Sequence, residues 1–521
     1  MLIGFVALYL AVSVGIGLYA ATRVHNTKDF ALAGRSLPLP VVTATVFATW
    51  FGAETVLGVS ATFVKDGLGG VVGDPFGASM CLILAGLFFA PKLYRMGLLT
   101  IGDYYRVRYD RTVEVVTSIA IVISYLGWVA AQIKALGLVF NLVTGGAISV
   151  EWGMVLGTAI VLTYTTFGGM FAVAFLDFIQ MMVVMCGLLF ITWLISGMTG
   201  GVGAVIAHAD AAGKLQFFPA EARLALWVPF IGAWITMMLG SIPQQDVFQR
   251  INSAKDEKTA VRGSVLGGSL YFVFAFVPMF LAYAAIMVDP ALFGNLVKTD
   301  SQLVLPTLIL QHTPVFAQVI FFGALLAAIM SCSSATLLAP SVSFSENIVK
   351  GFYPGMSDKR FLLVMRISLV VFALVVLLIA LNSKLTIFQM VESAYKVTLV
   401  TAFIPLVFGL YWSRATTQGA YFAMTLGLSV WLSCEVFVKS EVWLAQLVGF
   451  IAAFIGMIVG SLLPQKVGRH GAGHGHSAHD AHTTHTAHDA NAGHAGNAAH
   501  AGHSHAHPHG PQPAPAPTPK E

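Results

Sequence analysis

The sequence predicts an all-α polytopic membrane protein, and two observations carry this prediction. The first is composition: 57% of the 521 residues are hydrophobic, 10% are charged, and the mean hydropathy is +0.80. Soluble domains keep roughly a quarter of their residues charged, so this chain must turn much of its surface to lipid. The second is the recurrence, up to about residue 465, of apolar segments of about 20 residues, the length of a helix that crosses a bilayer.

Thirteen such segments are candidate transmembrane spans. They cover residues 2–22, 39–63, 74–94, 114–142, 150–167, 171–196, 224–243, 262–288, 315–348, 361–381, 386–412, 417–437 and 441–463. No basic region or cleavage site precedes the first segment, which favours a retained span over a signal peptide.

The basic residues of the loops predict the orientation in the membrane. With thirteen spans, the loops after odd-numbered spans and the C-terminal tail share one side. Up to Arg469, these loops and the span ends beside them hold eighteen Lys and Arg, against six on the other side. The six are Lys65, Lys214, Arg223, Lys298, Lys384 and Lys439. Basic loops stay in the cytoplasm. The expected location is therefore the cell inner (plasma) membrane, with the N-terminus outside and the C-terminus inside.

The second and seventh spans have compositions that predict broken helices. The second holds several Thr and Gly residues together with Glu54, and the seventh ends in a stretch with Gly240 and Pro243. Irregular backbone at membrane depth survives only where protein buries it or it lines a cavity. Interrupted segments at matching places indicate inverted repeats around a transport site, here spans two to six and seven to eleven. The alternative is that small residues merely allow close helix packing.

Charged residues inside spans are costly and usually functional. Glu54 can meet a solute hydroxyl or amine, or pair with a neighbouring helix. Asp177 can serve a cation path or lie at the interface. Glu392 and Lys396 are four residues apart on one helix face, and we expect them to form a structural ion pair.

Hydroxyl and aromatic residues add two further candidates. Span nine holds a serine cluster over residues 327–334. Its hydroxyls and main-chain carbonyls can replace the hydration shell of sodium, although serine-rich helix packing explains the cluster equally well. Trp50 and Trp128 lie in the middle of spans rather than at the interface. They can form a pocket wall that holds a solute or cation, or they can simply fill space.

The motifs of common enzymes and pumps are missing from the sequence. There is no nucleotide-binding loop, no hydrolytic triad and no metal-ligand box, and the four cysteines stand alone. We therefore expect no enzyme activity, no nucleic-acid partner and no organic cofactor. An ion gradient is the natural energy source, because one charge moving across 100 mV supplies about 2.3 kcal/mol.

Residues 466–521 are predicted to be a separate, disordered, His-rich cytoplasmic tail. Thirteen histidines lie between His470 and His509, among small and polar residues that cannot form a core. Such tracts bind zinc, nickel or copper weakly, and the most closely spaced candidates are His474, His476, His503, His505 and His507. The alternative is a dispensable low-complexity tail.

Four stretches carry a resemblance to a known family. They are residues 33–37 (AGRSL), 164–180 (YTTFGGMFAVAFLDFIQ), 240–250 (GSIPQQDVFQR) and 327–350. On these stretches the chain resembles the sodium/solute symporter family, and within it the choline-carrier branch and its bacterial relatives. The resemblance implies a LeuT-type 5+5 inverted repeat with an extra leading helix for residues 1–465, the transmembrane symporter domain.

The resemblance also implies which residues bind. For sodium these are main-chain oxygens of Ala48, Phe51 and Ala328, the side chains of Ser331 and Cys332, and Asp177 near the sodium path. For the solute they are Trp50, Trp128 and the position of Gln244, to which Glu54 is added because it is a charged residue inside a span. Two departures stand out: a thiol is a poor sodium ligand, with Ser333 or Ser334 as candidate substitutes, and Gln244 leaves an aromatic cage incomplete.

Together these features predict sodium-coupled secondary symport of a small organic solute by alternating access, with Na⁺ as the coupling ion. One alternative is a membrane sensor that keeps the transporter fold and signals through its tail. The other is a metal-linked transporter regulated by the His-rich tail.

Overall fold

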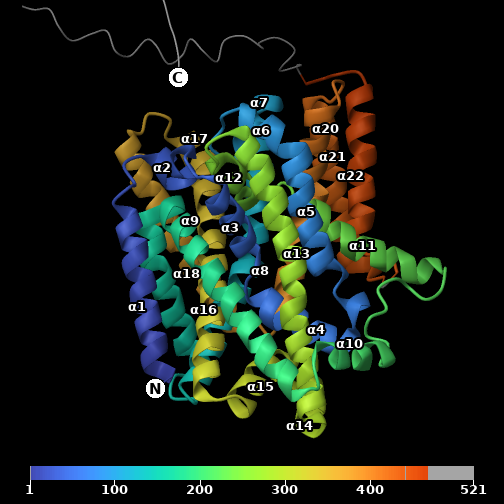
Figure 1. Cartoon of the computed structure of the whole chain (residues 1–521). Helices are drawn as coiled ribbons and strands as arrows, with labels where there is room; N and C mark the ends of the chain where they lie inside the picture. The colour runs from blue at the N-terminus through green and yellow to red at the C-terminus, as the bar shows by residue number, and fades with distance from the viewer. Residues whose placement is uncertain (1, 441, 468–521) are drawn as a thin grey trace, which may run out of the picture. The chain divides into compact units, whose positions relative to one another are not determined.

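The computed structural model describes residues 2–440 and 442–467 (Figure 1). In these ranges helices are joined by turns and loops, and the β-structure is one isolated bridge between Leu37 and Ala254. The α-helices are α1 Leu2–Ala21, α2 Thr27–Leu32, α3 Leu39–Trp50, α4 Ser60–Asp66, α5 Ala78–Leu84, α6 Ala90–Arg95, α7 Ile101–Arg108, α8 Arg111–Val143, α9 Val150–Met198, α10 Val202–Ala211, α11 Leu224–Gly240, α12 Gln245–Ser253, α13 Glu257–Val288, α14 Pro290–Thr299, α15 Val304–His312, α16 Val315–Ser343, α17 Lys350–Phe352, α18 Asp358–Asn382, α19 Ile387–Thr398, α20 Ile404–Tyr411, α21 Thr417–Ser433 and α22 Ala445–Leu462. Shorter 3-10 and π-helical turns are Ala33–Arg35, Glu54–Val59, Leu68–Gly70, Val72–Gly77, Ala85–Phe89, Ser301–Leu303, Phe344–Val349, Leu399–Phe403 and Cys434–Val438.

Every predicted span lies on a helix of this bundle. Within the described ranges ten helices are long and apolar enough to cross a membrane, and two bent helix pairs bring the number to twelve. The helix α9 contains two of the predicted spans, because its 49 residues would reach about 74 Å if straight, roughly twice the bilayer. It turns at Gly169, whose φ of 47° and ψ of −141° are backbone angles that residues with a side chain rarely adopt. A Cβ at this position would lie 2.5 Å from the Phe30 carbonyl oxygen.

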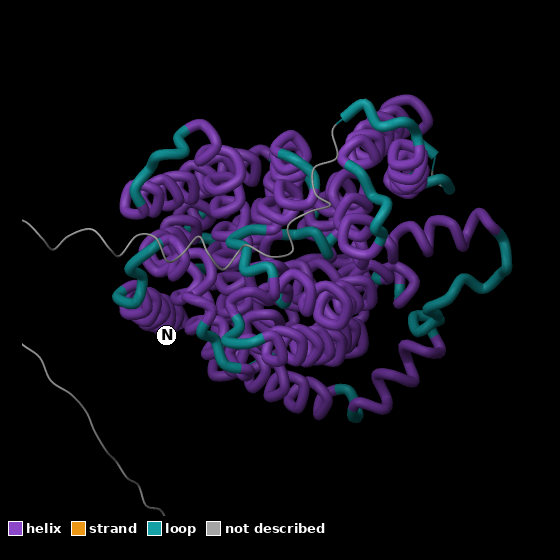
Figure 2. Tube along the Cα trace, turned by 90° about the horizontal axis from the view of Figure 1, so that it is seen from above, coloured by secondary structure: helices purple, strands orange, loops and turns teal. Residues whose placement is uncertain are grey.

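The short helices gather at the two ends of the bundle. Figure 1 shows α2, α6, α7, α12 and α17 at one end and α10, α14 and α15 at the other. Seen from above in Figure 2, most long helices are viewed end-on and stand side by side. This arrangement places the odd-numbered and even-numbered loops at opposite ends, as the alternation of thirteen spans requires.

The second and seventh spans are broken, as predicted. The helices α3 and α4, with the π-helical turn Glu54–Val59 between them, are bent by 53°, and α11 and α12 are bent by 46°. The ninth span differs from these two, because α16 runs without a break through its serine cluster and past Pro340. Every residue from Ala324 to Ser343 is buried, so this part of α16 lies in the protein interior and not against lipid.

Small residues bring the helices around the broken spans into close contact. A Cβ added at Gly267 of α13 would lie 2.6 Å from Val46 Cγ1 of α3, and one at Gly187 of α9 would lie 3.0 Å from Ala324 Cβ of α16. Helix association in a membrane depends on such close packing because lipid provides little hydrophobic driving force between helices. The contacts hold α3 between α13, α9 and α16, which fixes the place of its broken end.

Candidate functional site

The break in span two frees main-chain oxygens in the protein interior. The helix α3 ends at Trp50, and Phe51 has φ −84° and ψ 80°, which are not helical. The N–H of Gly52 donates to Trp50 O at 3.1 Å, and the N–H of Ala53 donates to Gln132 Oε1 at 2.9 Å. In an unbroken helix these two groups would bond the carbonyls of Ala48 and Thr49. Those carbonyls are therefore available to other partners.

Span nine and span six meet this break. The hydroxyl of Ser331 donates to the Ala48 carbonyl at 3.2 Å and contacts the Asp177 carboxylate, which also accepts a hydrogen bond from Thr45. All four residues are buried. Three of the predicted sodium-site residues, from spans separated by up to 283 positions, thus come together at one point.

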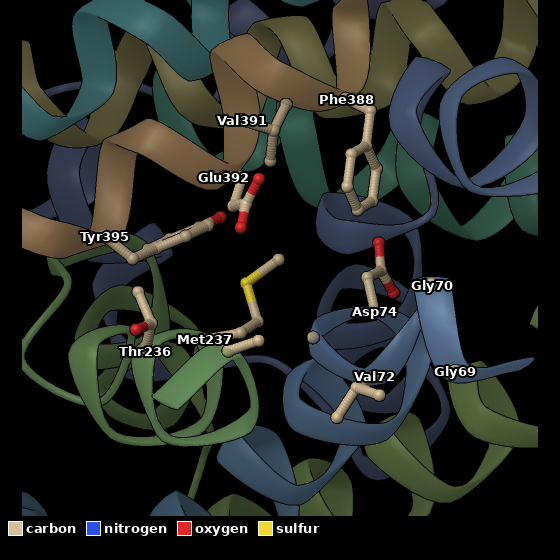
Figure 3. Close-up of a pocket in the computed structure, with 12 residues that line it drawn as sticks. Gly69, Gly70, Val72, Asp74, Thr236, Met237, Phe388, Val391, Glu392 and Tyr395 are labelled. Atoms are coloured by element: carbon tan, nitrogen blue, oxygen red, sulfur yellow. The ribbon is translucent and has the colours of Figure 1, made fainter. Parts of the chain in front are cut away.

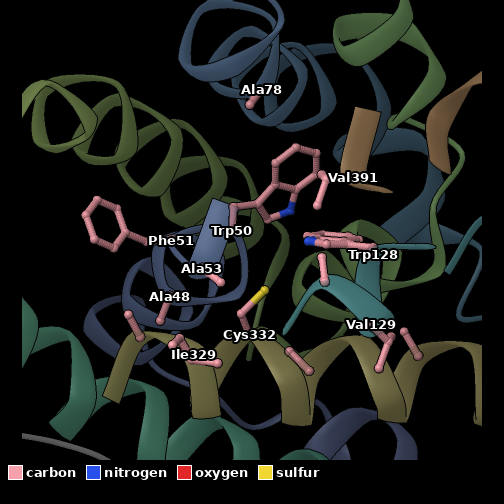
Figure 4. Packing of buried hydrophobic residues seen from close by; sticks show 14 of the residues in the cluster. Ala48, Trp50, Phe51, Ala53, Ala78, Trp128, Val129, Ile329, Cys332 and Val391 are labelled. Atoms are coloured by element: carbon pink, nitrogen blue, oxygen red, sulfur yellow. The ribbon is translucent and has the colours of Figure 1, made fainter. Parts of the chain in front are cut away.

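The other predicted sodium-site residues lie beside this point with different roles. Phe51 lies in the non-helical segment, and Ala328 is buried on α16 one turn before Ser331. The Cys332 sulfur packs against the break, since a Cβ at Gly52 would be 2.8 Å from it, and Figure 4 shows it pointing from α16 towards the broken segment. The hydroxyls of Ser333 and Ser334 donate to carbonyls of their own helix, at 2.6 and 2.9 Å.

Four aromatic rings form a buried cluster next to the break. Trp50 and Trp128 are edge-to-face with centroids 5.4 Å apart, as Figure 4 shows for the two indoles. Tyr395 of α19 stacks on Trp50 at 6.0 Å and meets Trp128 at 5.6 Å, while Tyr125 stacks on Trp128 at 5.9 Å. The rings touch one another, so a solute reaches their faces only when they separate.

Glu54 is the acidic member of this cluster. Its carboxylate is 2% exposed and accepts hydrogen bonds from Trp128 Nε1 at 3.0 Å and from Gln132 Nε2 at 2.6 Å. None of the ion pairs found among the described residues includes Glu54. A buried carboxylate with two neutral donors and no cation has a strong attraction for a positive charge.

Gln244, which was expected to leave an aromatic cage incomplete, forms hydrogen bonds to side chains next to the rings. Its amide nitrogen donates to Ser124 Oγ at 2.9 Å and reaches Thr398 Oγ1 at 3.4 Å. It is buried at the bend between α11 and α12. The third wall of the aromatic cluster is instead Tyr395, from span eleven. Sequence reasoning missed Tyr395, although it lies between the two charged residues singled out in that span.

A second polar network, also missed from sequence, lies where α12 begins. Asp246 accepts hydrogen bonds from Trp50 Nε1 at 3.1 Å and from the Tyr125 hydroxyl. Arg250, one helical turn on and 2% exposed, donates from Nε to Thr49 Oγ1 at 2.9 Å. Both residues stand in the motif at 240–250, which gave the only signal for them. The network connects the two broken spans to span four.

Two further expectations concern an ion pair in span eleven and a metal site in the tail. The predicted ion pair between Glu392 and Lys396 is wrong: it is not among the ion pairs of the described residues, because Glu392 faces a pocket in front of Tyr395. The five tail histidines lie outside the described residues. Within those residues there is no group of three or more His, Cys, Asp or Glu side chains that could hold a metal ion.

The fold and the buried site together define a class of protein. Two broken helices that meet beside an ordered cluster of hydroxyl, carbonyl and carboxylate oxygens, inside a bundle of membrane-spanning helices, are typical of secondary transporters with inverted repeats. The chain belongs to the sodium:solute symporter family, whose family model matches residues 30–427. It is a transporter and not an enzyme, and its function is sodium-coupled symport of a small solute.

The chain is also similar to individual transporters and to a solved structure. The chain is 27% identical over 463 residues to high-affinity choline transporter 1 of Caenorhabditis elegans, covering 82% of this chain and 77% of the relative. It is 25% identical over 481 residues to the osmoregulated proline transporter OpuE of Bacillus subtilis, covering 88% and 94%. The solved structure of a Na⁺-coupled sialic acid symporter in a substrate-bound outward-open state matches with a TM-score of 0.76 at 20% identity, covering 88% and 97%. The predicted LeuT-type fold is confirmed.

Proposed function

We propose that the transported solute is a small organic cation that binds between Glu54 and the rings of Trp50, Trp128 and Tyr395. The observation that carries the proposal is the buried Glu54 carboxylate, which has two neutral N–H donors and no ion pair among the described residues. A cationic head group would neutralise it, and the faces of the surrounding rings attract cations. The choline transporters among the relatives support this solute class.

Gln244 modifies the proposal. Because an amide takes the place of a third tryptophan, the cage for a fully methylated ammonium is incomplete, and Tyr395 supplies the missing wall. A phenol hydroxyl and the Glu54 carboxylate both suit a head group that carries N–H or O–H donors. The zwitterion proline, the substrate in the name of another relative, is the alternative solute, with its amine at Glu54.

The sodium ion is proposed to bind at the break of span two. Its ligands would be the main-chain oxygens of Ala48, Phe51 and Ala328 and the hydroxyl of Ser331, with Asp177 supplying negative charge behind Ser331. The bond between Ser331 and Ala48 supports this proposal, because it brings two of these ligands within 3.2 Å. The thiol of Cys332 stands where an oxygen would serve sodium better, so we propose a weakly bound ion.

Coupling follows from the chain connection between the two sites. The Ala48 and Phe51 carbonyls of the sodium site and the Glu54 carboxylate lie close together in the chain, on the two sides of the non-helical break that follows α3. An ion that orders this segment also fixes Trp50 and Glu54 for the solute. Ordering by the first ligand lowers the cost of binding the second, which is positive cooperativity. Alternating access then moves the broken spans against spans four and nine.

The membrane and its orientation are part of the proposal. The excess of basic loops places the ends of odd-numbered spans in the cytoplasm and the N-terminus outside the inner (plasma) membrane. The tail is proposed to lie in the cytoplasm and to bind zinc, nickel or copper weakly. Equilibrium dialysis of the full chain and of a chain ending at residue 468 against each metal tests this, since only the full chain should retain metal.

The solute class is tested by thermal stability of the purified protein. A panel of organic cations, zwitterions and carboxylates is added with sodium or with potassium, and the melting temperature is measured. Organic cations should raise it, and only with sodium, because a ligand that binds the folded state alone stabilises it. Stabilisation by carboxylates and not by cations would refute the proposed charge. Uptake into proteoliposomes that ignores an imposed sodium gradient would contradict the coupling.

A further inference from the structure

A cavity of about 60 Å³ lies in front of the aromatic cluster, between three spans. Asp74 of span three, Thr236 and Met237 of α11, and Phe388, Glu392 and Tyr395 of α19 line it (Figure 3). In the picture the Tyr395 hydroxyl and the Glu392 carboxylate lie on one side of the space, and the Asp74 carboxylate lies on the other. Asp74 lies in the turn Val72–Gly77 that begins span three, Thr236 and Met237 lie near the C-terminal end of α11, and Phe388, Glu392 and Tyr395 lie along α19.

One polar atom in this cavity has no partner. The Tyr395 side chain is 1% exposed, and its hydroxyl forms no hydrogen bond among the described residues although it is buried. A buried donor without a partner costs about 1–3 kcal/mol, so such groups call for a specific explanation. Figure 3 shows this hydroxyl directed into the cavity, beside the carboxylate of Glu392. The cavity therefore offers a hydrogen-bonding atom that the protein itself does not use.

The charged side chains that line the cavity are all acidic. Asp74 is 2% exposed and accepts a hydrogen bond from the Tyr271 hydroxyl at 2.5 Å, and neither it nor Glu392 belongs to an ion pair among the described residues. The lining contains no basic side chain. Two carboxylates that face one small space raise the local concentration of cations and exclude anions. The rings of Phe388 and Tyr395 add faces that attract an organic cation.

We propose that this cavity is a second, outer binding site for the ammonium head of an organic cation, separate from the site at Glu54. The two sites share Tyr395, whose ring stacks on Trp50 while its hydroxyl faces the outer cavity. A rotation of this side chain opens the way from the outer site to the inner one. The volume suits the ligand, since about 60 Å³ is the room of two water molecules or one small ammonium group. The ligand class rests on the proposed function.

The site is tested by charge-selective labelling of a reporter thiol in purified protein. Gly69 lines the cavity, and a Cβ there meets no atom closer than 3.6 Å, so G69C fits. The accessible Cys186 and Cys434 are replaced by Ser, while Cys81 and Cys332 are buried. The rates of reaction with a trimethylammonium-ethyl and a sulfonatoethyl methanethiosulfonate are measured with and without methylammonium chloride, with sodium chloride as the ionic-strength control.

The expected result has two parts. Loss of one carboxylate, in E392Q or D74N, lowers the ratio of cation to anion labelling rates about fivefold at low salt. The rate with the cationic reagent falls and the rate with the anionic reagent rises, because a negative charge has been removed. Methylammonium, whose N–H groups can donate to both side chains, slows labelling of the parent and protects E392Q and Y395F at least about threefold less well. The matched control is E435Q, which removes an exposed carboxylate outside the cavity and leaves both measurements within about twofold.

Three outcomes overturn the proposal: no protection of the parent by methylammonium, equal protection of E392Q, or an unchanged labelling ratio in both carboxylate variants. Y395F guards against a folding artefact, because removing an unpartnered buried hydroxyl leaves stability unchanged or improved. Labelling needs no gradient and no transport. If the protein shows no sodium-driven uptake of the cation, the proposed function is rejected, and the labelling result still stands. If uptake is normal but labelling shows no charge selectivity or protection, only the outer site is rejected.

Discussion

The replacement of Glu54 by Gln examines the proposed solute site most directly. Gln has the size of Glu and keeps one oxygen for the Trp128 N–H at 3.0 Å, so the packing stays in place while the charge and the acceptor for Gln132 Nε2 are removed. A carboxylate and an ammonium about 4 Å apart attract each other by about 4 kcal/mol at an effective dielectric constant of 20. Desolvation of the ammonium offsets part of this. A loss of about 2–3 kcal/mol corresponds to a KM roughly 30- to 150-fold higher.

The assay is uptake into proteoliposomes with an inward sodium gradient, using the organic cation that most stabilises the parent protein. E435Q is the control, because it removes an exposed carboxylate far along the chain from the site. A melting temperature of E54Q close to that of the parent shows that the fold is intact. If E54Q then transports the cation with a KM within about threefold of the parent, Glu54 does not bind the cation and the charge argument fails.

Further predictions concern sodium, the fold and the tail. S331A removes a sodium ligand, so the sodium concentration for half-maximal uptake should rise about tenfold while the solute KM at saturating sodium changes little. C332S replaces a soft thiol with a hard hydroxyl oxygen, so the same sodium concentration should fall several-fold; a rise would show that position 332 does not contact the ion. G169A forces a left-handed residue against Phe30 and should cost at least about 2 kcal/mol, seen as a lower melting temperature than that of A172G, a control in the same helix. A chain ending at residue 468 should keep sodium-driven uptake within about twofold of the full chain, and its loss would favour a role of the tail in transport.

The spans could be predicted from the sequence because their causes are local. A run of apolar residues long enough to cross a bilayer has to become a helix, since backbone groups find no partners in lipid. Gly, Thr and Pro next to Glu54 and Gln244 marked the two breaks, and the structure bends the chain at both. The glycines at 168–169 likewise separated two spans that the structure joins in one bent helix.

Pairings across the bundle could not be read from the sequence. The rule that charges four residues apart on a helix attract each other predicted a pair between Glu392 and Lys396, but Glu392 lines a cavity that its own helix forms with two other spans. The motif that contains Gln244 likewise gave no sign of its hydrogen bonds to Ser124 and Thr398. Both sets of contacts depend on how separate helices face one another across the bundle.

The sequence by itself determined that this protein is a bundle of membrane helices with two interruptions and a set of hydroxyl, acidic and aromatic residues in suitable spans. Only the tertiary structure decided which of them meet. Ser331 contacts the Ala48 carbonyl across 283 positions, and Tyr395 closes the ring cluster from another span. Local sequence fixes hydrogen bonding within a helix, whereas contacts between helices depend on side-chain packing over the whole bundle, which no short stretch encodes.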